Sequence, residues 1–529
     1  MFKNSPYFMS NDRISILKTT IIFSFVIVVL RLFYWQIYQG QSVRNRSLNQ
    51  IYSQTKILPN LGHLLASDSF PLSLDSRYFL LSLYKPNLGQ KLEDVLLYLE
   101  KIKPGLSLES KKQIEFFLKP NIKWVTLPTK FSSQDLKKIN IPGVSFEEVS
   151  SRYYPEGNLA KDVLLNLESF YKRTLSGKVG FSVAPVDATG QLILSRKNWH
   201  KSEVDGTDIS LSLNRQVQSI LTSSLKLGLK RFQAENATGI IINPQNGEII
   251  AISSVAQDST PSSSLRPISS LFEPGSIFKP LVLAMALNEK SIGLDFVCPV
   301  CNKPRTYGQY TINNWDGKTH PNSNLPDVIK NSDNIAMSYI IEKLGLTSFQ
   351  RYFHLLELDQ KTNVDLLGES VSPLKKYWSD IDLATASFGQ GFAVNELQIL
   401  RAFNTLANGG ILVSPHLNVN FPSKEIVVFP ADTVNKVVDI LKYAVETGAV
   451  SSLKPKDIDV CAKSGTAQIA ISGQYADTDT VASYIGFSPC QNPKFTMIII
   501  FNKPQLSTWG SSTAAPVWFE IASKISPLL

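Results

Sequence analysis

Cysteine and histidine are scarce in this 529-residue chain, which contains four cysteines and five histidines. Four cysteines are too few for a fold held together by a disulfide framework. No histidine stands in a pattern typical of a Ser-His-Asp triad, so the sequence gives no indication of a histidine base. Charged residues are also few, at 18%, against 43% hydrophobic residues. This composition excludes a disordered chain and predicts two or three globular domains.

Basic residues outnumber acidic ones, but they do not form a stripe interleaved with aromatic residues. The formal net charge is +9. A nucleic-acid-binding protein would concentrate this charge on one face or along one helix. The scattered charge argues against a nucleic-acid partner and fits a protein that works beside anionic lipid or an anionic wall polymer.

The four cysteines leave three arrangements open. Cys298 and Cys301 could form half of a structural zinc site that Cys461 and Cys490 complete. The first two could instead form a local disulfide outside the membrane, or they could be free thiols. The spacing does not choose among these arrangements, and we predict no metal and no cofactor.

The longest apolar run lies near the N-terminus, at residues 16–38. It is about long enough to cross a bilayer and carries interfacial aromatic residues close to Arg31. No small-residue cleavage site follows, which favours a retained transmembrane anchor over a removed signal peptide. We expect residues 1–15 to form a cytoplasmic tail and the long C-terminal part to lie outside the membrane. Positive charges flank both ends of the span, so this orientation depends on the function predicted below.

Two regions follow the predicted anchor. Residues 39–203 mix short strands and helices between Pro, Gly and Asn turns, and they contain no cluster of catalytic residue types. Residues 204–529 contain a predicted hairpin at 237–252, then helices, and then three more strands. These last strands are expected at 460–471, 481–487 and 495–501. Strands at both ends predict one sheet with helices packed on it, which makes the fold class α+β.

A serine and a lysine stand three residues apart directly after a Pro-Gly turn, at Ser276 and Lys279. The apolar run that follows predicts a buried helix with Ser276 at its start. At this spacing the lysine amine can reach the serine hydroxyl. Burial, the positive end of the helix and a second cation would each disfavour the charged lysine and make it a base. The pattern alone is weak, because it also occurs at Ser15/Lys18, Ser53/Lys56, Ser169/Lys172 and Ser223/Lys226.

Two further clusters lie downstream. Ser332-Asp333-Asn334 precedes an apolar run that starts a helix, and taken alone it is a good helix N-cap. Lys463-Ser464-Gly465-Thr466 lies in a run that reads as a strand, and taken alone it is a turn between two strands. The glycine in this second cluster lets another group approach the backbone closely.

The three clusters in this order form the signature set of the penicillin-recognising serine acyltransferases. The whole chain resembles a class B, monofunctional penicillin-binding protein. The segment from Arg152 to Gly157, together with Glu168, looks like the pedestal motifs of that family. The resemblance covers essentially the complete chain.

The resemblance implies a pedestal of the dimerisation type at residues 39–203 and a transpeptidase domain at residues 204–529. The transpeptidase domain would have the fold of the serine β-lactamases, an antiparallel sheet with helices on both faces. The chain departs from the family at some positions, among them Asn395-Glu396, where Thr-Pro is common. The departures leave the three clusters intact.

The resemblance also assigns catalytic roles. Ser276 would attack the D-Ala-D-Ala carbonyl of a stem peptide while Lys279 takes its proton, and an acyl-enzyme would form as D-alanine leaves. Ser332 would relay a proton to the leaving amine, and Asn334 would hold Lys279 and the amide of the donor peptide. Lys463 would supply a positive field that helps keep Lys279 neutral.

Substrate binding is assigned by the same resemblance. Ser464 and Thr466, on either side of Gly465, would bind the terminal carboxylate of the stem peptide. The backbone N–H groups of Ser276 and Thr466 would form the oxyanion hole. The implied partners are peptidoglycan stem peptides, β-lactams as inhibitors, the membrane, and division or elongation proteins. A polytopic glycosyltransferase is among these partners, because the region before the transpeptidase domain is of the pedestal type.

Two alternative functions stay open. A serine hydrolase of the same superfamily, a β-lactamase or D,D-carboxypeptidase, would share the clusters, and Ser-Asp-Asn is also the form found in class A β-lactamases. The anchor and the long pedestal argue against this alternative. A non-catalytic β-lactam sensor or division scaffold is the second alternative, and the intact clusters argue against it. The sequence does not separate a septal role from a role in side-wall elongation.

Overall fold

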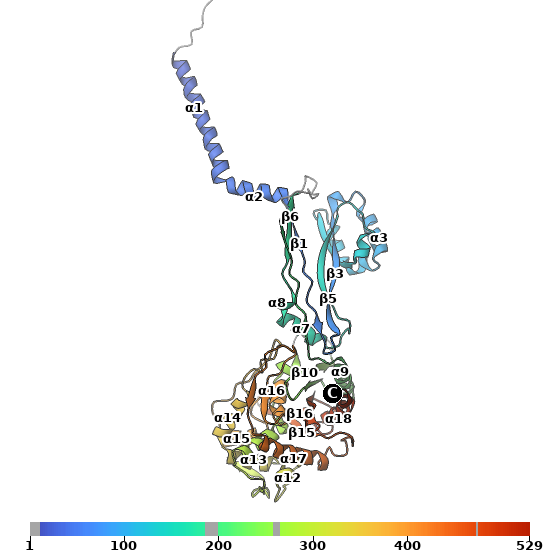
Figure 1. Cartoon of the computed structure of the whole chain (residues 1–529), viewed down its shortest axis with the longest axis vertical. Helices are drawn as coiled ribbons and strands as arrows, with labels where there is room; N and C mark the ends of the chain where they lie inside the picture. The colour runs from blue at the N-terminus through green and yellow to red at the C-terminus, as the bar shows by residue number, and fades with distance from the viewer. Residues whose placement is uncertain (1–10, 186–198, 258–264, 472–473) are drawn as a thin grey trace, which may run out of the picture. The chain divides into compact units, whose positions relative to one another are not determined.

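The computed structural model of the chain describes residues 11–185, 199–257, 265–471 and 474–529 (Figure 1). The chain divides into two compact units. Unit 1 comprises Met1–Asn60 and Ser176–Gly206. Unit 2 comprises Leu61–Leu175 and Thr207–Leu529 and contains all three of the clusters singled out in the sequence.

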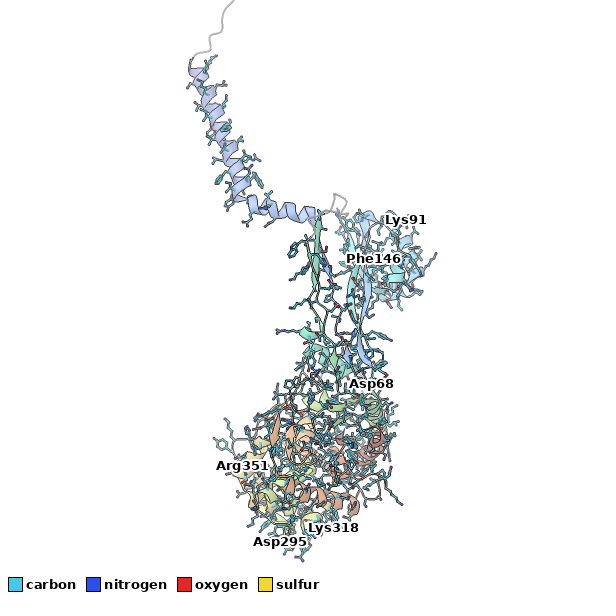
Figure 2. The ribbon with its side chains drawn as sticks, viewed as in Figure 1. Asp68, Lys91, Phe146, Asp295, Lys318 and Arg351 are labelled. Carbon is cyan, nitrogen blue, oxygen red and sulfur yellow. A yellow bond between two sulfur atoms is a disulfide. The ribbon has the colours of Figure 1, made fainter. Side chains whose placement is uncertain are left out.

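Unit 1 begins with a long apolar helix. Helix α1 spans Asn11–Phe33 and continues through the π-helical turn η1 at Tyr34–Tyr38. Within the described ranges, Arg13–Tyr38 is the one helix long and apolar enough to cross a membrane, with a mean hydropathy of 2.2. Its large apolar side chains are exposed along its length (Figure 2). Such exposure is costly in water and favourable in lipid, so this helix suggests a membrane anchor.

The rest of unit 1 brings two distant segments into one small sheet. Strand β1 (Tyr52–Ile57), which follows helix α2 (Gly40–Ile51), pairs antiparallel with β6 (Gly180–Pro185). Strand β6 also pairs antiparallel with β7 (Trp199–Lys201), which gives the order β1-β6-β7. The sheet explains why residues before position 61 and after position 175 belong to one unit.

The N-terminal part of unit 2 is built on one long strand, β3 (Pro71–Tyr84), which pairs with both β4 and β5. In β4, alternate residues such as Val125 and Leu127 are buried, and they pack against Val95 and Leu99 of helix α3. The sheet order is β4-β3-β2-β8, with β5 on the side of β3. The other elements of this part are β2 (Leu64–Leu65), β4 (Trp124–Phe131), β5 (Val144–Tyr153), β8 (Ile209–Ser210), η2 (Lys85–Asn87), α3 (Leu92–Ile102), α4 (Leu106–Glu109), α5 (Lys111–Phe117), α6 (Ser133–Leu136), α7 (Lys161–Phe170) and α8 (Lys172–Leu175).

A charged group lies where β5 meets α7. Arg152 Nε is 3.2 Å from Glu168 Oε1, and Arg152 Nη1 donates to the Gly62 carbonyl at 2.7 Å. Tyr154 donates its hydroxyl proton to Glu168 at 2.9 Å. Asp68, labelled in Figure 2, pairs with Arg215, the first residue of helix α9 (Arg215–Phe232). Arg152, Tyr154 and Glu168 therefore form one hydrogen-bonded group. All three belong to the segments that resemble the pedestal motifs of the family.

The C-terminal part of unit 2 is organised around a five-stranded antiparallel sheet in the order β10-β9-β17-β16-β15. The predicted hairpin and the three predicted C-terminal strands all belong to it. The strands are β9 (Asn236–Ile242), β10 (Ile249–Ala256), β15 (Cys461–Ile471), β16 (Gln474–Ser488) and β17 (Phe495–Asn502). The N- and C-terminal strands of the domain thus close one sheet, as the sequence indicates.

Helices cover both faces of this sheet (Figure 1). Helices α9 (Arg215–Phe232) and α18 (Ala514–Ile525) pack on one face, where Ile241 of β9 and Trp518 share a core. Ile240 and Ile242 point to the opposite face, because side chains alternate along a strand. That face is covered by α10 (Arg266–Ser269), α11 (Lys279–Asn288), α12 (Leu325–Lys330), α13 (Asn334–Leu344), α14 (Leu346–Leu355), α15 (Asp380–Ala386), α16 (Glu396–Asn404) and α17 (Ala431–Thr447). The predicted fold class is confirmed.

Short elements complete the domain. The 3₁₀ turn η3 (Gly275–Phe278) leads directly into α11 and contacts β15. Two small hairpins lie between the helices, β11 (Arg305–Tyr307) with β12 (Tyr310–Ile312) and β13 (Ile411–Val413) with β14 (Glu425–Val427), and η4 (Ser526–Leu528) ends the chain. The contact between η3 and β15 brings the first and third sequence clusters together.

Candidate active site

The turn that carries Ser276 is fixed between a strand and a loop. Gly275 has φ of +61°, and its N–H donates to the Gly389 carbonyl at 3.0 Å. A Cβ on Gly389 would collide with the Gly275 backbone, and a Cβ on Gly275 would lie 3.3 Å from the Thr466 carbonyl oxygen. Glycine is required at both positions for this close approach. Ser276 therefore lies in the 3₁₀ turn just before α11, with Lys279 as the first residue of that helix.

The Lys279 amine is completely buried and faces three oxygen atoms. Its Nζ lies 2.6 Å from the Ser332 carbonyl oxygen, 3.0 Å from Ser332 Oγ and 2.7 Å from Asn334 Oδ1. Burial lowers the pKa of Lys279 well below its usual value, and the positive charge of Lys463 lowers it further, while Asp333 acts in the opposite direction. Its surroundings therefore favour the neutral form of the amine more than water does.

Ser332 connects this amine to Ser276. Its hydroxyl lies 3.0 Å from Ser276 Oγ and 3.0 Å from Lys279 Nζ. Ser332 has φ of +56°, a conformation that serine rarely adopts and that is typical of functional sites. The left-handed turn presents both the carbonyl oxygen and the hydroxyl of this residue to the lysine amine.

Helix α13 holds the rest of the second cluster. Asp333 is its N-cap, because Oδ1 accepts from the Ala336 N–H at 2.8 Å. Asn334 follows as the first helical residue, so Oδ1 faces Lys279 while Nδ2 donates to the Asn313 carbonyl at 3.0 Å. The N-cap expected from Ser-Asp-Asn is confirmed at Asp333, and the catalytic roles of Ser332 and Asn334 stay predictions.

The third cluster lies in β15 beside the serine turn. Lys463 is buried, its Nζ donates to the Ser464 carbonyl at 2.9 Å, and burial lowers the pKa of its amine to about 7. A Cβ on Gly465 would lie 2.8 Å from Cγ2 of Ile277, so only glycine lets the turn pack on the strand. Thr466 Oγ1 accepts the Gly510 N–H at 3.0 Å, which leaves its own proton free to donate.

The structure thus brings all eight predicted site residues into one region of unit 2. The residues at the surface of this region, each partly exposed, are Ser276, Ser332, Asn334, Ser464 and Thr466. The two lysines lie beneath them and are buried. The roles of these residues, including the oxyanion hole formed by the backbone of Ser276 and Thr466, stay predictions.

Several residues around the site have no motif in the sequence that would have marked them. Asn314 Oδ1 accepts from the backbone N–H groups of Asn334 and Ile335, at 2.8 and 3.3 Å. Trp315 and Trp509 are both exposed, and their rings meet edge to face at 5.1 Å. The Asn-Asn-Trp-Asp-Gly run before Lys318 was a recognisable turn signal, but nothing in the sequence linked it to Ser332.

The cysteines form two disulfides, one between Cys298 and Cys301 and one between Cys461 and Cys490. The local disulfide was one of the open arrangements. The second disulfide joins β15 to the segment after β16 and was not predicted. Among the described residues, no group of three or more His, Cys, Asp or Glu is arranged to hold a metal ion.

A serine, a buried lysine and a second serine in this geometry are typical of serine acyltransferases. Comparison with known proteins agrees. Residues 237–525, more than half of the chain, match the family model described as the penicillin binding protein transpeptidase domain. The chain belongs to this family.

The chain is also similar to individual proteins that have been named. The peptidoglycan D,D-transpeptidase FtsI of Buchnera aphidicola subsp. Baizongia pistaciae is 25% identical over 577 residues, which cover 97% of this chain and 95% of that protein. FtsI of Escherichia coli K12 is 26% identical over 416 residues, 72% of this chain and 68% of FtsI. Penicillin binding protein 2X of Streptococcus thermophilus has a similar fold, with a TM-score of 0.72 over 90% of this chain and 81% of that one at 21% identity. The predicted resemblance to class B penicillin-binding proteins is confirmed.

Proposed function

We propose that this chain is a membrane-anchored peptidoglycan D,D-transpeptidase that crosslinks stem peptides through an acyl-enzyme on Ser276. The observation that carries the proposal is the buried Lys279 amine, held by Ser332 and Asn334 and joined to Ser276 through one hydroxyl. Membership of the transpeptidase family and the names of the FtsI relatives support the same reaction. β-Lactams would acylate the same serine.

Acylation follows from the hydrogen bonds of a neutral lysine. Such an amine has two N–H donors, and they match the Ser332 carbonyl oxygen and Asn334 Oδ1, which only accept. Its lone pair is then left for the Ser332 hydroxyl at 3.0 Å. As Ser276 Oγ bonds to the D-Ala-D-Ala carbonyl carbon, its proton passes to Ser332, and the proton of Ser332 passes to Lys279.

The same hydroxyl can complete the first half-reaction. When the C–N bond breaks, Ser332 donates a proton to the departing D-alanine nitrogen and is reprotonated by Lys279. The amine of a second stem peptide then attacks the ester carbonyl and loses a proton to Lys279 by the same route. The new amide forms, Ser276 recovers its proton, and the enzyme returns to its starting state.

Strand β15 would bind and polarise the donor peptide. The Thr466 hydroxyl, whose oxygen accepts from Gly510, is set to donate to the terminal carboxylate together with Ser464. The backbone N–H groups of Ser276 and Thr466 would hold the oxyanion, and such a donor typically stabilises the transition state by ~3 kcal/mol. Charged Lys463 would add a positive field for both negative groups.

With this function, the catalytic domain would lie outside the cytoplasm and the N-terminus inside. Two disulfides favour this side of the membrane, because disulfides persist in oxidising compartments. The domain division follows from the same proposal, with a pedestal at 39–203 and the transpeptidase domain at 204–529. A polytopic glycosyltransferase and other division or elongation proteins would supply and position the glycan strands.

Acylation by benzylpenicillin tests the proposal. The full chain in detergent is incubated with the drug, and intact mass and peptide mapping locate the adduct in the wild type and in Ser276→Ala. We expect a stable adduct confined to Ser276 in the wild type and no adduct in the variant. No adduct with consumed drug would indicate a hydrolase instead. No adduct with intact drug would indicate an inactive fold, and either outcome would reject a transpeptidase.

A further inference from the structure

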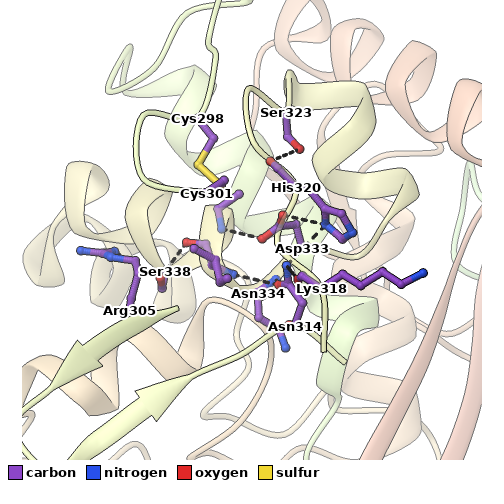
Figure 3. The surroundings of a disulfide bond; sticks show 12 residues. Cys298, Cys301, Arg305, Asn314, Lys318, His320, Ser323, Asp333, Asn334 and Ser338 are labelled. Carbon is purple, nitrogen blue, oxygen red and sulfur yellow. Dashed lines mark hydrogen bonds and ion pairs between the residues drawn. A yellow bond between two sulfur atoms is a disulfide. The ribbon is translucent and has the colours of Figure 1, made fainter. Parts of the chain in front are cut away.

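A turn that carries Asn314, Lys318 and His320 lies beside the second cluster (Figure 3). The turn runs from Asn313 to His320. The Asn313 carbonyl accepts from Asn334 Nδ2, and Asn314 Oδ1 accepts from the backbone N–H of Asn334 at 2.8 Å. These contacts fix the backbone and side chain of a residue that binds the Lys279 amine.

His320 ends this turn and lies between two carboxylates. Its Nδ1 is 3.0 Å from Asp333 Oδ2, and its Nε2 is 3.3 Å from Asp316 Oδ2. The Asp333 side chain is 0% exposed, whereas those of His320 and Asp316 are 19% and 20% exposed. Among the described residues, no other charged group lies within ion-pair distance of the ring. Asn314 Nδ2 also lies 3.4 Å from His320 Nδ1. A carboxylate only accepts hydrogen bonds, so each ring nitrogen contacts its carboxylate as an N–H donor.

Asp333 needs such a partner because of its position. It lies between the two residues that contact the Lys279 amine, Ser332 and Asn334, and it is completely buried. Burial and Lys463 lower the pKa of Lys279, and the negative charge of Asp333 opposes both. An uncompensated carboxylate at this position would therefore favour the charged, non-basic form of the lysine.

We propose that His320 is a positioning residue for acylation, which offsets the charge of Asp333 and fixes the turn of Ser332 and Asn334 around the lysine amine. The inference rests on the proposed function, because its effect is read in the acylation of Ser276. His320 itself touches neither Ser276 nor Lys279 within the contacts described above. It acts on the base through Asp333.

The first disulfide steadies the loop that carries His320. The Cys298 N–H donates to the Ser323 carbonyl at 2.9 Å, and Ser323 Oγ donates to the His320 carbonyl at 2.8 Å. Figure 3 shows the disulfide, Ser323, His320 and Asp333 in one neighbourhood. The histidine ring is thus held from its backbone side as well as by the two carboxylates.

The pH profile of acylation distinguishes charge compensation from simple packing. The rate of benzylpenicillin acylation of the full chain is measured against pH for the wild type, His320→Gln and His320→Lys. In His320→Gln the negative charge of Asp333 is no longer offset, which raises the pKa of Lys279. The midpoint, which is the pH at which the acylation rate reaches half its maximum, should therefore move upward by about one pH unit. His320→Lys keeps a cation between the carboxylates and should restore the wild-type midpoint.

His354→Gln is the matched control. His354 also contacts a carboxylate, with its Nδ1 3.3 Å from Asp359, but its side chain is 67% exposed and lies on α14. This variant should leave the midpoint unchanged. If His320→Gln lowers the melting temperature and leaves the midpoint where it is, His320 has only a structural role and the inference is wrong.

A second variant protects the test against misfolding. Asp316→Asn removes only the outer, partly exposed negative charge and leaves His320 beside Asp333, so it should move the midpoint slightly downward, opposite to His320→Gln. If His320→Gln does not fold, a wild-type midpoint in Asp316→Asn overturns the inference. A wild type that benzylpenicillin does not acylate would overturn the proposed function and, with it, this inference. An acylated wild type with unshifted variants would overturn this inference alone.

Discussion

Buried charges are treated differently in two regions of unit 2. At the active site, Lys279 and Lys463 are buried, and neither has a carboxylate within ion-pair distance among the described residues. Where α16 packs on the segment after α14, Arg401 is as deeply buried, but its Nη1 lies 2.7 Å from Glu357 Oε2. Arg401 Nε also donates to the Val413 carbonyl at 2.9 Å.

The difference shows how one physical effect has two results. Burial lowers the pKa of both active-site lysines, because neither has a carboxylate within ion-pair distance among the described residues and the opposing effect of Asp333 on Lys279 is smaller than desolvation. Burial would raise the pKa of Glu357, but hydrogen bonds from Arg401 and Lys424 outweigh it and hold this pKa below the usual value. Desolvation therefore accompanies amines with lowered pKa values in one region and an ion pair in the other.

The largest expected effect is a loss of activity when a lysine of the active-site region is replaced. Lys279→Met should reduce benzylpenicillin acylation by about 10²–10⁴-fold, the range of general base catalysis. The melting temperature should stay the same or rise, because methionine fills a similar volume without desolvating an amine. The rate of benzylpenicillin acylation is measured from the amount of adduct at successive times, and the melting temperature is measured by thermal unfolding. A melting temperature that falls sharply would mean that this lysine is held for structure and would break the comparison.

The second effect concerns stability at the ion pair. Arg401→Met should lower the free energy of unfolding by about 3–5 kcal/mol, because it leaves Glu357 buried with one partner fewer. Acylation of the folded fraction should keep its wild-type rate. Lys436→Ala is the control, since its ion pair with Asp432 is on the surface and should contribute less than about 1 kcal/mol. Equal destabilisation by the two variants, measured by denaturant unfolding, would contradict the distinction.

The smallest expected effect is on the pH dependence of stability. It concerns Glu396, a buried carboxyl group. Glu396 is buried at the start of α16 and accepts a hydrogen bond from Thr238, and burial raises its pKa to about 8. The folded state then holds a proton that the unfolded state releases above pH 4.5, its unperturbed pKa. The stabilisation is complete below that pH and is lost as the pH rises to about 8.

Glu396→Gln should remove this pH dependence, which amounts to about 1.4 kcal/mol for each pH unit in the window. Thermal unfolding of the wild type and the variant at pH 5.5 and 7.5 measures it. We expect the variant to gain stability relative to the wild type at the higher pH. Parallel behaviour of the two proteins would show that Glu396 is ionised in the folded state.

Local patterns in the sequence predicted most of the sheet and the three clusters. The predicted hairpin at 237–252 and the C-terminal strands lie in β9, β10, β15, β16 and β17, because buried strands are continuous apolar runs between turn residues. The serine turn was recognisable from its Pro-Gly signal, although Ser276 lies in a 3₁₀ turn and Lys279 begins the helix. Asp333 was recognisable as an N-cap.

Contacts between distant segments were not predictable in the same way. Nothing local connects Asn314 to Asn334 or His320 to Asp333, because hydrogen bonds across a loop leave no periodic pattern in the sequence. The pairing of Cys461 with Cys490 likewise depends on the sheet that places them side by side. The same holds for Glu396, which meets Thr238 only through the packing of α16 on β9.

The sequence by itself predicted the reacting groups, since the order of its three motifs is typical of the family; the residues are Ser276, Lys279, Ser332, Asn334 and Lys463. The tertiary structure decided their state. Burial and neighbouring charge set the pKa of Lys279, and both depend on atoms that residues far along the chain bring into place. The sequence gives the type of each residue directly. The desolvation of a side chain and the electric field that acts on it depend on the atoms that surround it in the folded protein.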